Sequence, residues 1–284
     1  GIDGERDLWE RELKSLPGYE GSAPVRIGNG AAEQYQADVV GEVLLALGAA
    51  RDAGLEESAF SWPLERALLA HVAEQLDRPD NGIWEIRGEP RKFTHSRVML
   101  WVAFDRAVQA VHEHGLDGPV ERWERIRAEL EAEIDAQGYD AERGHFVQSY
   151  GTSEVDAALL VLPQVGFCAP DDPRMLGTVA EIERTLMADG LVHRYRTTTG
   201  VDGLAGHEHP FLACSFWLVV QYAASGRLAD ATALMDRLCG LANDVGMLSE
   251  EYDVHAHRHA GNTPQALSHL ALVRAADAIA AASA

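Results

Sequence analysis

Residues 211–220 read Phe-Leu-Ala-Cys-Ser-Phe-Trp-Leu-Val-Val and predict a helix that is buried on nearly all sides. Residues 119–137 also have helical spacing, but they carry a run of charged side chains between Glu121 and Glu133, which predicts one solvated face. The chain therefore contains both inner and outer helices. Alternation of these two kinds is what a double-layered α/α barrel requires.

Helical periodicity extends over most of the chain, and strand-like alternation is rare. We therefore expect an all-α fold in a single domain, residues 1–284. Proline near helix starts and glycine after helix ends support the boundaries. The expected helices are residues 31–53, 63–76, 95–114, 119–137, 154–164, 173–188, 211–225, 228–244 and 263–282.

Four segments between these helices are long and rich in aromatic, glycine and charged residues: 79–94, 139–153, 191–210 and 247–262. They exceed the usual length of a connection, which is typical of functional loops. Because they follow alternate helices, we expect them to emerge on one face of the barrel and to form a site there.

Composition excludes several kinds of partner. The formal net charge of −21 over 284 residues disfavours nucleic acid and anionic membranes, which would be repelled. The three cysteines, Cys168, Cys214 and Cys239, are few and irregularly spaced, as expected in a reducing compartment. No signal peptide or bilayer-spanning run is visible, so we expect a cytoplasmic protein.

One loop places a glutamate beside apolar residues, in the sequence Asn-Gly-Ile-Trp-Glu-Ile-Arg-Gly at 81–88. Burial of Glu85 against Trp84 and its isoleucine neighbours would raise its pKa and allow it to act as a general acid. Arg87 and Arg91 would act in the opposite direction. The alternative is a surface carboxylate paired with those arginines.

A second acidic segment, Leu-Ser-Glu-Glu-Tyr-Asp at 248–253, lies in another long loop. Only one of the adjacent Glu250 and Glu251 is expected to point into a given pocket. Such a triplet is also common in ordinary loops and helix starts. Two carboxylates brought together from separate loops are nevertheless what glycoside hydrolysis needs, since one protonates the leaving oxygen and the other activates water.

Other candidate residues have simpler interpretations. The segment Arg194-Tyr195-Arg196 could bind sugar hydroxyls or form a solvated turn, and Phe211 and Trp217 are interpreted as core residues. Alternating histidines at 255, 257 and 259 lack ligand spacing to cysteine or carboxylate, so no metal site is expected. The sequence contains neither a phosphate-binding glycine loop after a strand nor a nucleophile elbow. No cofactor is therefore expected.

Several motifs together resemble glycoside hydrolase family 15, the glucoamylase family, in its bacterial glucoamylase and trehalase-like branch. Any one of them is weak, but their order and spacing make the match specific, and they extend over nearly the whole chain. They are Val-Arg-Ile-Gly-Asn at 25–29, the 82–88 segment with Phe-Thr-His-Ser at 93–96, Gln-Ser-Tyr-Gly at 148–151, Asp-Asp-Pro-Arg at 171–174, Arg-Tyr-Arg at 194–196, Cys-Ser-Phe-Trp at 214–217, the 248–253 segment and Gly-Asn-Thr-Pro-Gln-Ala at 261–266.

The resemblance implies a six-hairpin α/α barrel that hydrolyses α-linked glucosides or trehalose from the non-reducing end with inversion. Glu85 matches the family's general acid, and Glu250, following Ser249, matches its general base. A small carbohydrate is the implied substrate, and no cofactor is implied. The residues expected to contact or surround the sugar are Gln34, Asp38, Trp84, Arg194, Tyr195 and Glu251.

The chain departs from the family pattern at Val40 and Thr263, and it has nine predicted helices where a complete barrel has twelve. We therefore expect the first barrel helices to be missing. An incomplete barrel would expose the flanks of its inner helices and pair with another copy. The alternative function is a non-catalytic toroid that binds carbohydrate or needs a missing segment or partner. A sugar epimerase shares the barrel, but it would use histidine pairs.

Overall fold

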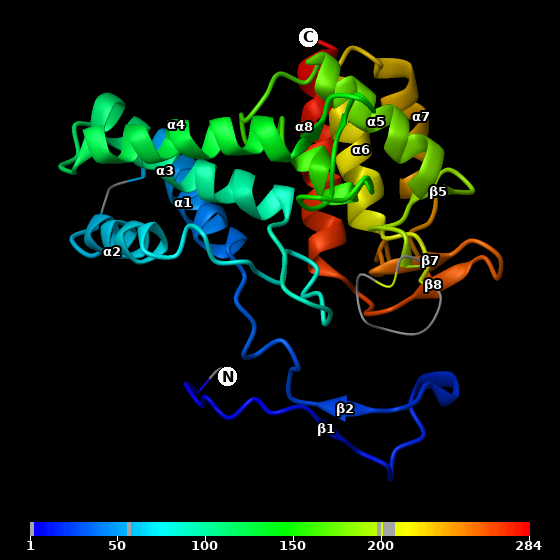
Figure 1. Ribbon diagram of the computed structural model, residues 1–284. Coiled ribbons are helices and arrows are strands. Elements are labelled where there is room, and N and C mark those ends of the chain that lie inside the picture. Colours follow the sequence, from blue (N-terminus) through cyan, green and yellow to red (C-terminus); the bar gives the residue numbers. More distant parts are fainter. Residues whose placement is uncertain (1–2, 56–57, 198–199, 201–207) are drawn as a thin grey trace.

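The computed structural model describes residues 3–55, 58–197, 200 and 208–284, and most of them are helical (Figure 1). The α-helices are α1 (Asp38–Asp52), α2 (Ser61–Ala73), α3 (Thr94–His114), α4 (Val120–Gln137), α5 (Pro173–Leu186), α6 (Leu212–Ala224), α7 (Leu228–Cys239) and α8 (Ala266–Ala282). Two short 3₁₀ helices are η1 (Tyr19–Gly21) and η2 (Ala157–Val161).

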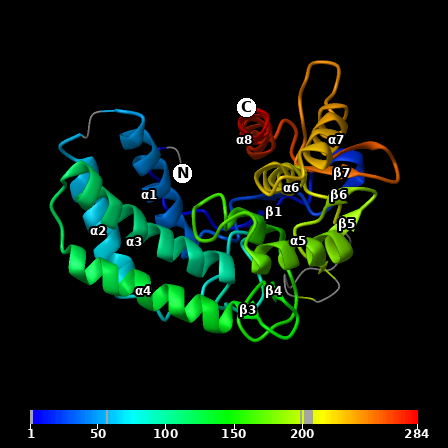
Figure 2. The same ribbon diagram turned by 90° about the horizontal axis from the view of Figure 1, so that it is seen from above.

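The helices follow an arc with α1 at one end and α8 at the other, as Figure 2 shows. Within it, α3 packs against α1 and α4, and α6 packs against α7 and α8. Helices α3 and α6 are buried on nearly all sides. Helix α4 buries only the stripe Trp123, Ile126, Leu130 and Ile134. The predicted contrast between a buried and a half-solvated helix is confirmed.

One predicted helix was wrong. Residues 154–164 do not form an α-helix, because Asp156 has an extended backbone and caps the short 3₁₀ helix η2 by accepting from the Ala158 N–H. Pro163 follows soon after and cannot donate a backbone hydrogen bond. The described residues therefore contain eight α-helices rather than nine.

The first helix begins later than predicted. Residues 31–37 were expected to be helical, but α1 starts at Asp38. The preceding residues bond instead to the 80–86 segment: Gln34 Nε2 donates to the carbonyl of Ile86, and the Ala37 N–H donates to Asp80. Tertiary hydrogen bonds thus replace helical ones in this segment.

Four short antiparallel hairpins lie where the sequence predicted loops or a helix end. They are β1 (Arg11–Glu12) with β2 (Arg26–Ile27), β3 (Tyr139–Asp140) with β4 (His145–Phe146), β5 (Met187–Ala188) with β6 (Leu191–Val192), and β7 (Glu251–Asp253) with β8 (Arg258–Ala260). Strands of two or three residues are too short to show an alternating pattern. Periodicity alone could not find them.

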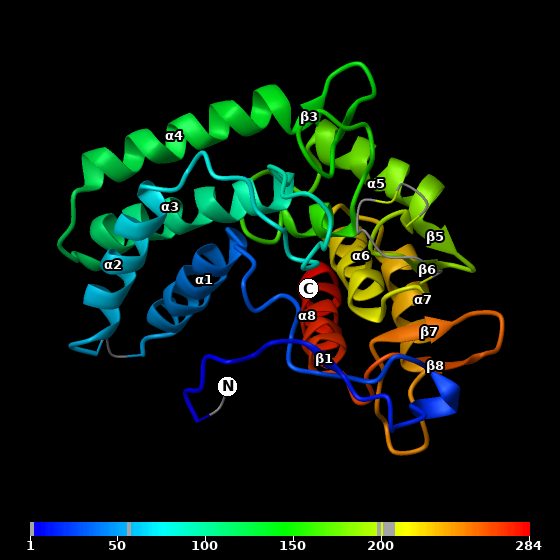
Figure 3. The same cartoon turned by 60° about the horizontal axis from the view of Figure 1, so that its bottom comes forward.

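The expectation that the long loops meet on one face is confirmed by the hydrogen bonds and ring contacts between them. Phe93 pairs with Ser149, the ring of Trp84 packs on that of Tyr195, and the Tyr252 N–H donates to the Pro210 carbonyl. These links join all four predicted loops in one continuous layer at the end of the arc. In Figure 3 the N-terminal segment with β1 and β2 crosses below the helices toward this layer.

Apolar side chains are exposed at both ends of the arc. On α1 these are Val39 and Val43, and on α8 they are Leu267, Leu270 and Val273. Within the described ranges, none of the helices combines the length and apolar composition that crossing a bilayer would require.

Candidate active site

The turn that carries Glu85 is fixed by the residues before it. Asp80 Oδ2 accepts hydrogen bonds from the Gly82 N–H and the Ser96 hydroxyl, and Asn81 Nδ2 donates to the Ile86 carbonyl. A Cβ on Gly82 would come within 3.0 Å of the Phe93 ring, so the tight packing requires glycine there. The buried polar groups of this turn thus set the path of the chain into Glu85.

Glu85 has a left-handed backbone, with φ of 53°. A non-glycine residue in this region is strained, and such strain is often found at functional sites. The side chain is exposed, whereas its neighbour Ile86 is buried in the core. Of the two interpretations of Glu85, burial among apolar residues is not observed, because the turn directs the two neighbours to opposite sides.

The suggested pairing of Glu85 with nearby arginines is also not seen. Arg87 forms its ion pair with Glu10, at 2.8 Å. No described residue donates a hydrogen bond to the Glu85 carboxylate, which faces solvent. The carboxylate is therefore positioned by its backbone and is open to an approaching molecule.

Trp84 is part of an aromatic cluster beside Glu85. Its ring centroid lies 5.7 Å from that of Phe211, 5.9 Å from Trp217 and 6.5 Å from Tyr195. Its indole N–H donates to the buried Asp156 carboxylate at 2.8 Å. The interpretation of Phe211 and Trp217 as core residues is confirmed by their burial. Trp84 itself remains half-exposed.

Arg194 lies over this cluster. Its guanidinium carbon is 5.4–5.6 Å from the ring centroids of Trp84, Tyr195 and Phe211, within the range of cation–π attraction. The same guanidinium forms an ion pair with Glu208. Arg194 is thus not part of a solvated turn but is locked between aromatic rings and a carboxylate.

Glu250 is held through its side chain. Its Oε2 accepts hydrogen bonds from both the backbone N–H and the side-chain Nδ2 of Asn262, each at 3.0 Å. A Cβ on Gly261 would lie 2.8 Å from the same oxygen, and the φ of +71° at this position also favours glycine. No donor among the described residues reaches Oε1. The carboxylate is therefore oriented with one oxygen free.

Glu251, the next residue, begins β7 and is half-buried. Burial raises its pKa to about 7, Arg194 opposes this shift, and the carboxylates of Glu208 and Glu250 add to it. The His209 N–H donates to it at 3.4 Å. Adjacent glutamates thus have different surroundings, as expected when only one of them points into a pocket.

The remaining predicted residues lie on the Glu85 side. Gln34 Nε2 donates to the Glu85 carbonyl at 3.2 Å, so its amide supports the turn directly. Asp38 is 6% exposed, and burial raises its pKa to about 7. Tyr195 is buried against Ile86 and Phe93, with Trp84 beside it. The structure therefore brings Gln34, Trp84, Arg194 and Tyr195 close to the Glu85 turn, and Asp38 beneath it.

The two glutamate segments meet through Phe211. Its ring packs on Trp84 next to Glu85, its backbone pairs with Glu251, and the following N–H, of Leu212, donates to the Glu250 carbonyl at 3.0 Å. A polar cavity of about 670 Å³ adjoins Glu250, since Gly261 and Asn262 line it together with Tyr19 and His209. The arrangement can therefore present two carboxylates to a polar molecule beside an aromatic surface.

The histidines at 255, 257 and 259 belong to the β7–β8 hairpin. His255 and His257 are exposed, and the imidazole of His259 bonds to the Leu241 carbonyl. In the part of the chain that the structure describes, no three His, Cys, Asp or Glu side chains are grouped to hold a metal ion.

Sequence reasoning gave no role to Asp156, Glu208 or Asn262, which hold Trp84, Arg194 and Glu250 respectively. The role of Asp156 could have been suspected from the sequence, because this lone carboxylate directly precedes the apolar run Ala-Ala-Leu-Leu-Val. Asn262 had its place in the Gly-Asn-Thr-Pro-Gln-Ala motif at 261–266, whereas Glu208 had no signal beyond its place in a long loop.

Helices in two layers with polar, aromatic loops at one end define an α/α-barrel protein, and solved structures have the same fold. A structure described as "Glycosidase Wild Type" aligns with a TM-score of 0.73 at 22% identity, covering 93% of this chain and 74% of that one. A bacterial glucoamylase complexed with acarbose aligns with a TM-score of 0.68 at 15% identity, covering 86% and 41% respectively.

The family profile of glycosyl hydrolases family 15 matches residues 1–236 and 227–277. A trehalase of Mycobacterium tuberculosis is 41% identical over 275 residues, which are 97% of this chain and 40% of that protein. A trehalase of Thermoplasma acidophilum is 40% identical over 276 residues, or 97% and 47%. The chain belongs to glycosyl hydrolases family 15, and it spans less than half the length of these trehalases.

Proposed function

We propose that this chain forms the catalytic part of an inverting, exo-acting α-glucoside hydrolase and that its substrate is trehalose. Glu85 acts as general acid on the glycosidic oxygen, and Glu250 takes a proton from the attacking water. The observation that carries the proposal is the meeting of the two glutamate segments at Phe211, beside Trp84 and Arg194.

The surroundings of each carboxylate support these roles. The exposed Glu85 side chain is open to a leaving group, and Glu250 has one oxygen held by Asn262 and the other free to accept from water. Trp84, Arg194 and Tyr195 would contact the sugar at the cleavage point. Gln34 and Asp38 would support the sugar site from the side of Glu85, and Glu251 would support it from the side of Glu250.

Trehalose is chosen over maltose or isomaltose because the relatives with about 40% identity are named trehalases. The choice depends on the subsite that holds the leaving sugar. The polar cavity that Tyr19 and His209 line next to Asn262 is our candidate for that subsite.

The test is glucose release from trehalose, maltose and isomaltose by the purified chain, by Glu85→Gln and by Glu250→Gln. Each variant should lose about 10²–10⁴-fold in kcat, the usual contribution of a general acid or base. With the unaltered chain and trehalose, NMR at early times should detect α- and β-glucose in equal amounts, because inversion acts on only one of the two glucose units. Glu113→Gln, an exposed carboxylate far along α3, is the matched control. Full activity of either site variant would remove that residue from its role.

A second candidate function is a helical toroid that is inactive alone and needs another segment or a second copy. The exposed Val39 and Val43 on α1 and Leu270 and Val273 on α8 favour it, because apolar surfaces of this kind usually bind a partner. A folded chain that releases no glucose, together with a dimer in size-exclusion chromatography, would favour this candidate.

A further inference from the structure

Asp156 is a buried acidic residue that the roles of the two glutamates do not use. Its Oδ1 accepts from the indole Nε1 of Trp84 at 2.8 Å and from the Ala158 N–H at 2.7 Å. Its Oδ2 accepts from Gln148 Nε2 at 2.9 Å and from the same indole at 3.0 Å. These three donors converge on both oxygens, so the ionised carboxylate is the form that fits this place.

The hydrogen bonds of Asp156 exceed what helix capping requires. Capping of η2 needs one oxygen and the Ala158 N–H. Burial raises the pKa of the Asp156 carboxyl, and the donors of Gln148 and Trp84 oppose that shift because they favour the charged form. Hydrogen bonds to an ionised acceptor are stronger than neutral ones. The indole of Trp84 is therefore held by a stronger acceptor than a cap would supply.

The segment at Asp156 also joins the loops that carry the predicted sugar contacts. Through its side chain Asp156 binds Trp84 of one loop and Gln148 of another. The next residue, Ala157, donates its N–H to the Arg194 carbonyl at 2.8 Å. Trp84 and Arg194, which the proposed function places at the sugar, are thus attached to the same short stretch of chain.

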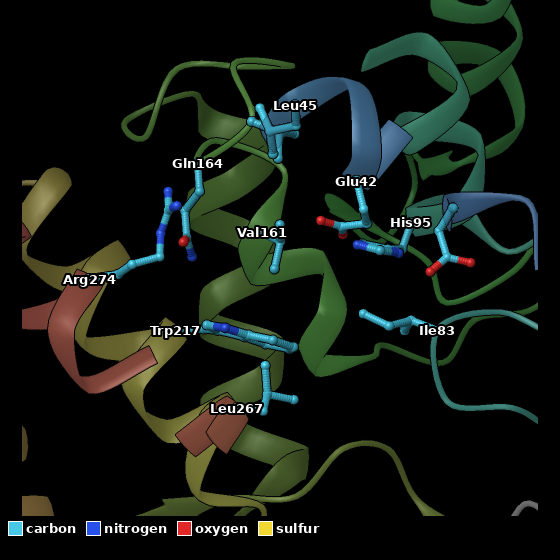
Figure 4. Close-up of a pocket in the computed structure, with 11 residues that line it drawn as sticks. Glu42, Leu45, Ile83, His95, Val161, Gln164, Trp217, Leu267 and Arg274 are labelled. Atoms are coloured by element: carbon cyan, nitrogen blue, oxygen red, sulfur yellow. The ribbon is translucent and has the colours of Figure 1, made fainter. Parts of the chain in front are cut away.

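A second connection runs from Asp156 to Trp84 through η2. This 3₁₀ helix packs against α6, the helix that carries Trp217. Figure 4 shows Val161, the last residue of η2, and Trp217 lining the same cavity. The ring of Trp217 lies 5.9 Å from that of Trp84. Asp156 therefore supports the Trp84 ring both at its N–H and through the residues packed on it.

The orientation of Trp84 matters because this residue directly precedes Glu85. It is half-exposed, whereas Phe211 and Trp217, which pack on it, are buried. An indole has one polar donor, and a buried donor needs a partner. The hydrogen bond to Asp156 therefore determines which edge of the ring faces inward and which surface faces solvent. A surface fixed before binding saves the cost of ordering it when a ligand arrives.

We propose that Asp156 is a positioning residue of the sugar site, which holds the indole of Trp84 in the orientation that binds the sugar. The inference rests on the proposed function, in which Trp84 contacts the sugar at the cleavage point. It adds that affinity for the sugar depends on a hydrogen bond that the sugar itself does not touch. Loss of the Asp156 charge should therefore weaken sugar binding through Trp84.

The experiment is a double-mutant cycle measured by calorimetric titration with trehalose, with all chains carrying Glu85→Gln so that the sugar is not consumed. Asp156→Asn keeps the shape and one acceptor but removes the charge, and it should weaken binding by about tenfold, a usual coupling for residues in contact. Trp84→Phe keeps a ring without the N–H. In that background Asp156→Asn should have little further effect. Equal weakening in both backgrounds would assign Asp156 to capping alone and overturn the proposal.

A spectroscopic readout of the same contact is the NMR signal of the Trp84 indole N–H, in protein labelled with ¹⁵N-tryptophan. The signal is identified by its loss in Trp84→Phe. It should lie downfield, as expected for a donor to a carboxylate, move upfield in Asp156→Asn and shift when trehalose is added. A position unchanged by Asp156→Asn would overturn the proposal. If that variant does not fold, a parent signal that saturating trehalose leaves unmoved would also overturn it.

Thr178→Val is the matched control for loss of a buried polar group. Thr178 is fully buried in α5, where its hydroxyl accepts from the Phe146 N–H and donates to the Arg174 carbonyl. This variant should lower the thermal melting temperature but leave trehalose affinity and the Trp84 signal unchanged. An equal loss of affinity in Thr178→Val would overturn the proposal. Glucose released by the Glu85→Gln chain would instead contradict the role of Glu85 and leave that of Asp156 intact.

Discussion

The turn that carries Glu85 and the hairpin that carries Glu250 position a carboxylate by different means. Glu85 is fixed by a strained backbone, with φ of 53°, while its side chain is exposed. Glu250 is not among the residues with positive φ, and its carboxylate is held by two donors from Asn262. One group keeps its orientation through the main chain and the other through hydrogen bonds to the side chain. Substitutions that change backbone freedom should therefore matter most at Glu85, and substitutions that disturb the contact with Asn262 should matter most at Glu250.

Among substitutions that leave both carboxylates in place, the largest effect is expected for Gly261→Ala. The added Cβ would lie 2.8 Å from Glu250 Oε2, so the carboxylate must move away from Asn262. Because a displacement of about 1 Å at a reacting group can cost about 10²-fold in rate, kcat for glucose release should fall by roughly that factor.

Gly246→Ala is the matched control for Gly261→Ala. Its φ of +79° is similar, but an added Cβ there has nothing within 4 Å. Both variants should lose similar stability in thermal melting, and only Gly261→Ala should lose activity. Equal activity losses would mean that backbone strain, and not contact with Glu250, is responsible.

An intermediate effect concerns the buried acid below the Glu85 turn. The pKa of Asp38 is raised to about 7 by burial, so the folded state retains a proton that the unfolded state has lost above pH about 4. Stability from this group is therefore complete below about pH 4 and declines as pH rises to about 7, with a slope of up to about 1.4 kcal/mol per pH unit.

Asp38→Asn should remove that decline. Urea denaturation of the parent and the variant between pH 4 and pH 8 should show the variant becoming relatively more stable as pH rises. Glu113→Gln should leave the dependence of unfolding free energy on pH unchanged. A difference between parent and Asp38→Asn that is independent of pH would mean that Asp38 is not protonated in the folded state.

The smallest expected effect is a difference in stability between glycine and alanine variants at positions 85 and 250, and it tests directly whether backbone strain holds Glu85. Glycine tolerates positive φ without the clash that a Cβ introduces, so Glu85→Gly should be more stable than Glu85→Ala by about 1 kcal/mol in urea denaturation. At position 250 the order should reverse, because glycine there only adds freedom to the unfolded chain. The same order at both positions would contradict the view that Glu85 is held by strain.

Several features of the fold could be predicted from the sequence because they depend on local order. The burial of α6 and the half-solvated face of α4 follow directly from where apolar and charged side chains recur along a helix. The helix expected at 154–164 failed because Asp156 is used to cap η2 and to accept from Trp84, a residue in another loop. The hairpins escaped prediction because two or three residues cannot establish an alternating period.

The two glutamates and their flanking residues were found in the sequence because each lies in a distinctive motif, and those motifs carry the resemblance to family 15. The solvent exposure of the acidic side chains could not be predicted. Glu85 has apolar neighbours in sequence but is exposed, whereas Glu251 and Asp38 are screened from solvent by elements far away in the chain. Sequence proximity describes the neighbours of a residue, and its solvation depends on what packs over it.

By itself the sequence determined the helical layers, the long loops and the family, since helical periodicity and short motifs are properties of consecutive residues. Only the tertiary structure decided that Arg194 lies over three aromatic rings, that Asn262 orients Glu250, and that Asp156 accepts from the indole of Trp84. Each of these contacts joins segments separated by long stretches of chain. Their geometry and electrostatics arise when the helices pack, because packing sets both the distances between charges and their access to water.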